Sequence, residues 1–382
     1  MKELGLYIHI PFCKQKCYYC DFVSYAKNEK FFERYIEALL EEMNNFFDNN
    51  DIEIKTIYIG GGTPSIIDAK YIEKIMNFFK EKDLLKKTKE ITIEVNPGTV
   101  DEEKIKCYKK AGINRLSIGL QSTDDNMLKK IGRIHCYKDF LNTYKFAKEA
   151  GFDNINVDIM IGLPKQKISD VKNTLEKIIN LEPEPPKHIS VYSLIVEENT
   201  PIEKMINEGT LELPNEENER NMYWYVKNFL ELNGYNHYEI SNFAKDGYES
   251  IHNSDCWKQK EYIGFGVAAH SFIDDVRFGN TSNLDEYLRN CENKDFEDNR
   301  IIDEVEKDLF SNEQEFMLVG LRMIDGVSIQ EFKNKFGENP IFVFKSELSK
   351  LVEDGLLMVD FDKIKLTNRG LDLANLVWEE FV

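Results

Sequence analysis

Long apolar runs and an excess of basic residues are both missing from this chain. No run approaches the roughly 18 residues that a membrane-spanning helix needs. Asp and Glu number 68 against 49 Lys and Arg, and the formal net charge of −19 excludes a general nucleic-acid binder, since excess basic residues hold phosphate backbones. The first residues also lack the small-residue cleavage site of a signal peptide. These absences predict a cytoplasmic protein with no membrane span, for which peripheral membrane contact stays open.

Cysteine is scarce and odd in number. The 382 residues include seven cysteines, of which Cys107, Cys136, Cys256 and Cys291 are scattered. An odd count in a reducing compartment argues against a disulfide framework and favours a metal site or reactive thiols. The length and the 42% hydrophobic content predict two or three domains with ample cores.

Short apolar segments alternate with amphipathic stretches over the first half of the chain. This alternation is typical of βαβ units and a parallel sheet. Six such strands predict an α/β fold with an open, partial (β/α)6 barrel, in which ligands bind at the carboxyl ends of the strands. The predicted strands are 4–10, 56–60, 91–95, 115–120, 155–162 and 188–195, and the predicted helices include 31–47, 69–80 and 139–150.

The last third of the chain has a different pattern. Residues 201–298 are less regular and are expected to form an elaboration that packs on the barrel of 1–200. Beyond the acidic stretch 291–300, capping boxes at 311–314 and 328–331 predict helix starts, and 355–367 resembles a β-hairpin. We therefore expect a small α+β, winged-helix-like C-terminal domain over 299–382. Residues 301–382 hold 9 Lys and Arg against 17 Asp and Glu, so DNA binding is rejected.

Three cysteines stand close together after the first predicted strand. Cys13, Cys17 and Cys20 form a C-x₃-C-x₂-C array. Zinc prefers four tetrahedral ligands and paired C-x₂-C halves; the sequence has no second pair, and His9, on the predicted strand, is the one nearby alternative ligand. Thiolates also hold iron–sulfur clusters. In a cubane of four irons, three cysteines leave one iron open to another ligand.

Further unusual residues follow the other predicted strands. The glycines of "GGGTP" (60–64) let the backbone approach a ligand closely, and no G-K-[ST] follows, which excludes a phosphate-binding loop. Glu94 and Asp158 interrupt apolar strands, and Gln121 ends one. A buried carboxylate is costly unless it is paired, which favours a ligand as the partner of Glu94.

The cysteine spacing, with Tyr19 before the last cysteine, resembles the radical S-adenosylmethionine (SAM) superfamily. The resemblance implies that SAM chelates the open iron of a 4Fe–4S cluster, and that the cofactor supplies the chemistry while the protein positions it. The stretches "YIHIPFCKQKCYYCDF", "GGGTPS", "IEVNPG", "RLSIGLQS", "IGRIH" and "VDIMIGLPKQ" follow in that order. Together they resemble the family of oxygen-independent coproporphyrinogen III dehydrogenases and their relatives, the HemW-type heme chaperones.

The resemblance carries over to individual residues of this chain. Cys13, Cys17 and Cys20 are implied to bind the cluster. Tyr7 and Tyr19 are implied to lie near SAM, and Gly61 and Glu94 to hold the cluster-bound SAM. For Arg133 the alternative is an ordinary solvated charge. The positions that match a second SAM site of the dehydrogenase are Gly62, Thr63, Gln121, Arg133 and Asp158.

Two departures favour the chaperone branch. The dehydrogenase has a further cysteine after the triplet, whereas Asp21 and Phe22 follow Cys20 here, and only 12 residues precede Cys13. The chaperone branch carries an H-N-x-x-Y-W motif linked to heme; this chain has "HNSDCW" (252–257), with cysteine in place of tyrosine. His252, or else His270, could ligate heme, although a lone histidine is more often structural. "GFGVAA" (264–269) matches a dinucleotide fingerprint but lacks a βαβ setting.

The resemblance implies two main functions. The first is a heme chaperone that holds a 4Fe–4S cluster with SAM, binds heme, and passes it to an acceptor such as a respiratory hemoprotein. The second is an enzyme that converts two propionates of coproporphyrinogen III to vinyl groups. A radical SAM enzyme with an unrelated substrate is a third, less favoured interpretation. Flavodoxin or ferredoxin would be the electron donor.

Overall fold

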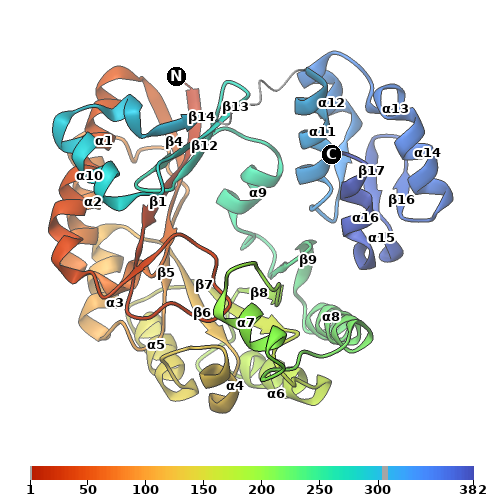
Figure 1. The fold of residues 1–382 in the computed structure, drawn as a ribbon, viewed down its shortest axis with the longest axis horizontal. Coiled ribbons are helices and arrows are strands. Elements are labelled where there is room, and N and C mark those ends of the chain that lie inside the picture. Colours follow the sequence, from red (N-terminus) through yellow and green to blue (C-terminus); the bar gives the residue numbers. More distant parts are fainter. Residues whose placement is uncertain (1, 303–308) are drawn as a thin grey trace.

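One large sheet organises most of the chain in the computed structural model, which describes residues 2–302 and 309–382 (Figure 1). Its centre is six parallel strands in chain order, each paired with the next, with register shifts at Leu4/Gly5 in β1 and at Gly119/Gln121 in β6. The predicted partial (β/α)6 barrel is thus confirmed, with the predicted strands displaced by a few residues at most. The strands are β1 (Lys2–Ile10), β4 (Ile52–Gly61), β5 (Glu90–Val95), β6 (Arg115–Gln121), β7 (Asn154–Ile161) and β8 (His188–Ser193).

Both edges of this sheet are extended by the middle of the chain. β11 (Tyr262–Phe265) lies parallel to β1, and three antiparallel strands continue from it: β12 (His270–Ile273), β13 (Val276–Asn280) and β14 (Arg300–Ile302). At the other edge, β10 (Asn242–Ala244) and β9 (Asn236–Glu239) follow β8. The region 201–298 therefore contributes strands as well as packing. These strands are too short to show a hydrophobic period. The boundaries at 200 and 298 stay predictions.

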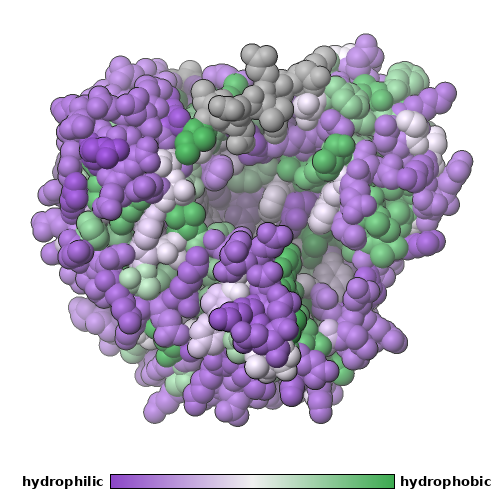
Figure 2. Space-filling model, in the orientation of Figure 1, coloured by the Kyte–Doolittle hydropathy of each residue, from purple (hydrophilic) through white to green (hydrophobic). Residues whose placement is uncertain are grey.

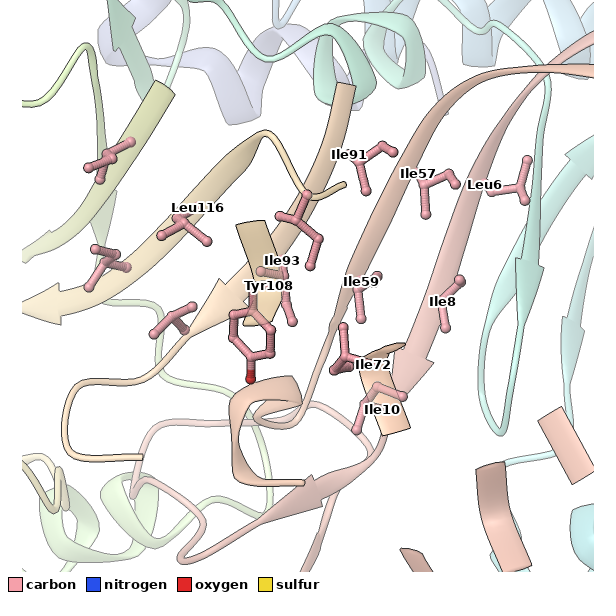
Figure 3. Packing of buried hydrophobic residues seen from close by; sticks show 14 of the residues in the cluster. Leu6, Ile8, Ile10, Ile57, Ile59, Ile72, Ile91, Ile93, Tyr108 and Leu116 are labelled. Atoms are coloured by element: carbon pink, nitrogen blue, oxygen red, sulfur yellow. The ribbon is translucent and has the colours of Figure 1, made fainter. Parts of the chain in front are cut away.

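The parallel strands divide their side chains between two environments. Leu6, Ile8, Ile57 and Ile93 pack with helix residues such as Ile72 in one buried cluster (Figure 3). The alternate positions face away from that cluster and are largely polar. Figure 1 shows the helices along the outer side of the sheet: α1 (Phe32–Asn49), α2 (Ala69–Glu81), α3 (Glu102–Ala111), α5 (Tyr137–Glu149) and α6 (Ile168–Ile179), of which the three predicted agree within two residues.

The C-terminal region has a core of its own, which includes Met317, Phe332 and Ile364. The predicted hairpin is present, and the small α+β character is confirmed. Ser328 caps its helix by accepting from the Glu331 amide at 3.3 Å. The capping box at 311–314 was wrong as a helix start, because the helix already includes Leu309. The elements are α11 (Leu309–Gly320), α12 (Ile329–Phe336), α13 (Pro340–Val343), α14 (Lys345–Glu353), and the strands β15 (Val327–Ser328), β16 (Leu357–Val359) and β17 (Lys363–Leu366).

Arg322 joins this C-terminal region to the rest of the molecule. Its guanidinium lies 4.3 Å from the ring centroid of Trp257, at the end of α9 (Ile251–Trp257), and 5.6 Å from that of Trp378 in α16 (Ala374–Glu379). Its Nη2 is 3.9 Å from Glu239, a side chain 1% exposed. The Ile240 amide donates to the Arg322 carbonyl at 3.1 Å.

In the part of the chain that the structure describes, every helix is too short or too polar to span a membrane.

Replacing Arg322 by methionine should lower the free energy of unfolding by about 3 kcal/mol, because the buried Glu239 carboxylate loses its cation. The control is Lys350→Met, which breaks the more exposed pair with Glu380 and should cost much less, because solvent screens that pair. Urea unfolding of both variants measures the difference. Equal losses of unfolding free energy in the two variants would show that the pair of Arg322 with Glu239 stabilises the fold no more than an exposed pair.

Candidate functional site

The loop after β1 brings the three predicted cluster ligands to one cavity. Cys13 ends the short strand β2 (Phe12–Cys13), and Cys17 and Cys20 lie in the turn that follows, where the Cys20 amide donates to the Cys17 carbonyl at 3.3 Å. The Tyr18 amide fixes this turn by donating to the Ile131 carbonyl at 3.1 Å. All three cysteines line a cavity of about 380 Å³. This cavity lies at the carboxyl ends of the parallel strands, as predicted.

The surroundings of the thiols suit an iron–sulfur cluster. Burial raises the pKa of Cys20 to about 11 and also raises that of Cys13, so these thiols stay protonated at neutral pH unless a metal takes the proton's place. Arg133 Nη1 lies 3.6 Å from Cys17 Sγ, and Thr63 Oγ1 donates to Cys13 Sγ at 3.5 Å. Both contacts would stabilise thiolates. The three cysteines therefore suit a cluster that is bound through thiolates, with Arg133 and Thr63 offsetting the negative charge of the sulfurs.

The thiols are not arranged around a single point. Within residues 2–302 and 309–382, no three His, Cys, Asp or Glu side chains are gathered closely enough to hold one metal ion. A cubane does not require that, because each thiolate binds a different iron. His9, the alternative fourth zinc ligand, is 5% exposed and bonded through both ring nitrogens, to the Tyr7 hydroxyl and the Val23 carbonyl.

The glycine segment closes one wall of the cavity at the end of β4. Gly61 has φ +118°, and a Cβ there would lie 2.7 Å from the His9 ring. A Cβ on Gly62 would lie 2.9 Å from the Phe12 carbonyl oxygen and 3.0 Å from Cys13 Sγ. Any larger residue would displace the cysteine loop. The two glycines therefore let the loop and the strand end meet at the cavity wall.

All but one of the residues expected to hold SAM line this one cavity. The exception is Tyr7, which lies behind the cavity wall in contact with Tyr58, a lining residue. His252, the candidate heme ligand, also lies behind the wall and stacks on Tyr58. Gln121 ends β6 with φ +67°, next to a break in the register with β7. The eight that line the cavity are Tyr19, Gly61, Gly62, Thr63, Glu94, Gln121, Arg133 and Asp158.

Glu94 and Asp158 place two carboxyl groups on the cavity wall. Glu94 Oε1 accepts from the Tyr58 hydroxyl at 2.9 Å, and Oε2 accepts from the Gly61 amide at 3.1 Å. Asn156 donates to Asp158 at 2.7 Å. Burial raises the pKa of Glu94 to about 7 and also raises that of Asp158. Both carboxyl groups therefore already have hydrogen-bond donors within the protein. The sequence predicted a ligand as the partner of Glu94 and did not include these donors.

Arg133 is not a solvated surface charge, so that alternative is wrong. Its Nη2 donates to the Gly119 carbonyl at 2.7 Å and to Asn96 Oδ1, while Nη1 faces Cys17. Asn96 also donates to Thr63 at 2.9 Å. Asn96 thus connects the arginine to the glycine segment.

Sequence reasoning missed several residues of the cavity. Asn96 follows β5 directly, so its place after a strand was a signal that could have been used. Tyr58, Ser117 and Met160 lie at interior positions of the strands, where no sequence pattern separated them from core. The other missed lining residues include Gln15, Lys16, Phe22 and Tyr192.

Comparison with known proteins agrees with this geometry. The sequence profile of the Radical SAM superfamily matches residues 7–178, and that of the HemN C-terminal domain matches residues 314–373. The heme chaperone HemW of Lactococcus lactis is 37% identical over 382 residues, which cover 100% of this chain and 98% of that protein. HemW of Bacillus subtilis is 38% identical over 98% of both chains.

This chain belongs to the HemW heme chaperone family. HemW of Escherichia coli is 32% identical over 100% of this chain and 99% of that protein. Among solved structures, the coproporphyrinogen III oxidase HemN of Escherichia coli superposes with a TM-score of 0.82, covering 100% of this chain and 90% of that one at 21% identity. This chain thus shares the HemN fold over its whole length, and the family resemblance read from the motifs is confirmed.

Replacing Cys17 by alanine should remove the iron–sulfur absorbance of the anaerobically reconstituted protein, because the cavity loses one of its three thiols. Cys107→Ala is the control, since Cys107 lies on α3 and does not line the cavity. Iron and sulfide analysis of both variants measures the outcome. Full iron and sulfide content in the Cys17 variant would contradict the assignment.

Glu94 should also make folding stability depend on pH. Its folded pKa, about 7, lies above the ordinary value of 4.5, so the folded state binds the extra proton and its stabilising effect is lost as pH rises from about 4.5 through 7. The difference in unfolding free energy between wild type and Glu94→Gln should therefore fall over this range and level off above it. A difference that does not vary with pH would show that Glu94 titrates normally.

Proposed function

We propose that this protein binds heme, carries a 4Fe–4S cluster with SAM in the cavity described above, and passes heme to an acceptor hemoprotein. The observation that carries the proposal is the convergence of Cys13, Cys17 and Cys20 on one cavity in a chain that belongs to the HemW heme chaperone family. The full-length match to relatives named heme chaperones supports the heme part of the proposal.

Different residues of the cavity would hold the cluster and SAM. Cys13, Cys17 and Cys20 would bind three irons, and Arg133 would offset the thiolate charge at Cys17. The carboxyl groups of Glu94 and Asp158 favour a positively charged group within the cavity, as the sulfonium and amine of SAM are. When bound, the cluster supplies one electron for the reductive cleavage of SAM.

Heme would bind outside this cavity, because neither of the two alternative axial ligands, His252 or His270, lines it. Their settings differ: His252 is 6% exposed, whereas His270 lies exposed on β12. Figure 2 shows the molecule hollowed at its centre, with apolar and polar side chains around the hollow. A respiratory hemoprotein as acceptor, flavodoxin or ferredoxin as electron donor, a cytoplasmic location and peripheral membrane contact remain parts of the proposal.

The second candidate function is decarboxylation of coproporphyrinogen III. It is favoured by Gln121, Arg133 and Asp158, which match the second SAM site of the dehydrogenase and all line the cavity. It is disfavoured by the residues after Cys20. Where the dehydrogenase has a further cysteine, this chain has Asp21 and then Phe22, a side chain 64% exposed at the cavity.

One anaerobic experiment separates the two functions. The reconstituted protein receives SAM and a reductant, together with heme in one arm and coproporphyrinogen III in the other. We expect heme to bind at one per chain, followed by its absorbance, and no vinyl product by mass spectrometry. Transfer is then measured by adding an apo-hemoprotein to the heme-loaded protein. Catalytic formation of protoporphyrinogen would overturn the chaperone assignment.

A further inference from the structure

His252 is held inside the barrel by the backbone around it. It lies two residues after Ser250, whose side chain caps α9 by accepting from the Asn253 amide. The buried Glu90 carboxylate accepts from the Ile251 amide at 2.8 Å, the His252 amide at 3.2 Å and the Ser250 hydroxyl at 3.2 Å. These bonds fix the first turn of α9 against β5. The His252 side chain therefore enters the barrel interior from a defined direction.

The imidazole ring is enclosed by β1 and β4. Its Nδ1 lies 2.8 Å from Thr56 Oγ1, and its ring stacks on Tyr58 with centroids 5.2 Å apart and planes 28° apart. A Cβ on Gly5 would lie 3.5 Å from the ring, in ordinary contact, and 3.2 Å from Thr56 Oγ1, so a side chain there would crowd the hydroxyl that meets the ring. Burial lowers the pKa of His252 to about 4. The ring is accordingly neutral and packed at physiological pH.

Tyr58 connects this ring to the cavity. The face of Tyr58 stacks on His252, and its hydroxyl donates to Glu94 Oε1 at 2.9 Å. Glu94 in turn accepts from the Gly61 amide at 3.1 Å. Tyr58, Glu94 and Gly61 all line the cavity. His252 is therefore one side chain removed from a carboxyl group that the proposed function assigns to SAM.

We propose that His252 is a positioning residue for the SAM cavity: it holds the Tyr58 ring so that the phenol keeps Glu94 oriented toward the ligand. The inference rests on the proposed function, because it takes SAM as the ligand of the cavity. It also gives His252 a role that does not involve the heme iron. A neutral, stacked histidine with its Nδ1 bonded to Thr56 supports Tyr58 from behind, as a second layer of residues supports a binding group.

The test measures SAM affinity and heme binding on the same variants of the full-length, anaerobically reconstituted chain. His252→Gln should raise the SAM dissociation constant on the order of fivefold, the effect expected for losing one hydrogen-bond-sized contact. Tyr58→Phe, which removes only the hydroxyl, should do the same. Because both act through one path, the double variant should be no weaker than Tyr58→Phe alone. A purely structural effect of His252 would instead add to that of Tyr58.

Heme titration provides the second readout. If His252 positions Tyr58, His252→Gln keeps the heme stoichiometry and the position of the Soret band. The matched control is His237→Gln, since His237 is also buried, at 8% exposure, and stacks on Phe243 with centroids 4.4 Å apart. Unlike His252, which stacks on a lining residue, His237 has the partners Tyr223, Ile240 and Phe243, which do not line the cavity. That variant should leave the SAM dissociation constant unchanged, whatever stability it loses.

The outcomes are distinct for this inference and for the proposed function. An unchanged SAM affinity in His252→Gln, additive effects in the double variant, or a lost or shifted Soret band would overturn the positioning role. If His252→Gln does not fold, the comparison of Tyr58→Phe with Thr56→Val still decides, because removal of the Thr56 hydroxyl should also weaken SAM binding. Wild-type protein that binds SAM but no heme would overturn the proposed chaperone function alone.

Discussion

A buried polar layer inside the barrel is the constraint on which the rest of this structure depends. Alternate side chains of the parallel strands point away from the helices, and a buried polar group destabilises the fold unless it is hydrogen-bonded. Asn156 meets this requirement by donating to Asp158 at 2.7 Å and to Ser117 at 2.8 Å. Its Oδ1 lies 2.6 Å from His188 Nδ1, and His188 Nε2 lies 2.8 Å from the Tyr238 hydroxyl. Asp158 and Ser117 of this network line the cavity, so the network ends at the cavity wall.

Charge in the barrel follows from the same requirement. Glu94 and Asp158 are kept near the cavity by neutral donors, and Arg115, 1% exposed, lies deeper on β6. Burial raises the pKa of both carboxyl groups, and the positive charge of Arg115 offsets only part of that rise. The cavity thus combines carboxyl groups that ionise reluctantly with Arg133 beside the thiols. This arrangement is matched to a ligand that carries both a positive centre and a carboxylate.

The helix α9 is anchored at both of its ends. Glu90 and Thr56 hold its first turn in the barrel, and Trp257, its last residue, packs on Arg322 of the C-terminal region. The stretch 252–257, which resembles the motif linked to heme in the chaperone branch, has a structural role here, because it connects the wall of the cavity to the C-terminal core.

The sequence alone determined the six central strands, the cysteine triplet and the carboxyl groups of the cavity. Apolar alternation and close cysteine spacing are local signals, and the order of the motifs was specific enough to identify the family. It also nominated eight SAM residues that the fold brings to one cavity. These successes share a cause: most of these residues stand inside a strand or close to its end, and parallel strands gather such positions at one edge.

Only the tertiary structure decided the rest. The edge strands of the sheet, the hydrogen bond from Arg133 to Asn96, and the enclosure of His252 by Gly5, Thr56 and Tyr58 all depend on contacts between segments far apart in the sequence. Burial and partners decide whether an arginine is solvated or structural, and whether a histidine is free to bind metal. Neither property is encoded in the few residues on either side, because both arise when distant strands and helices close around the same interior.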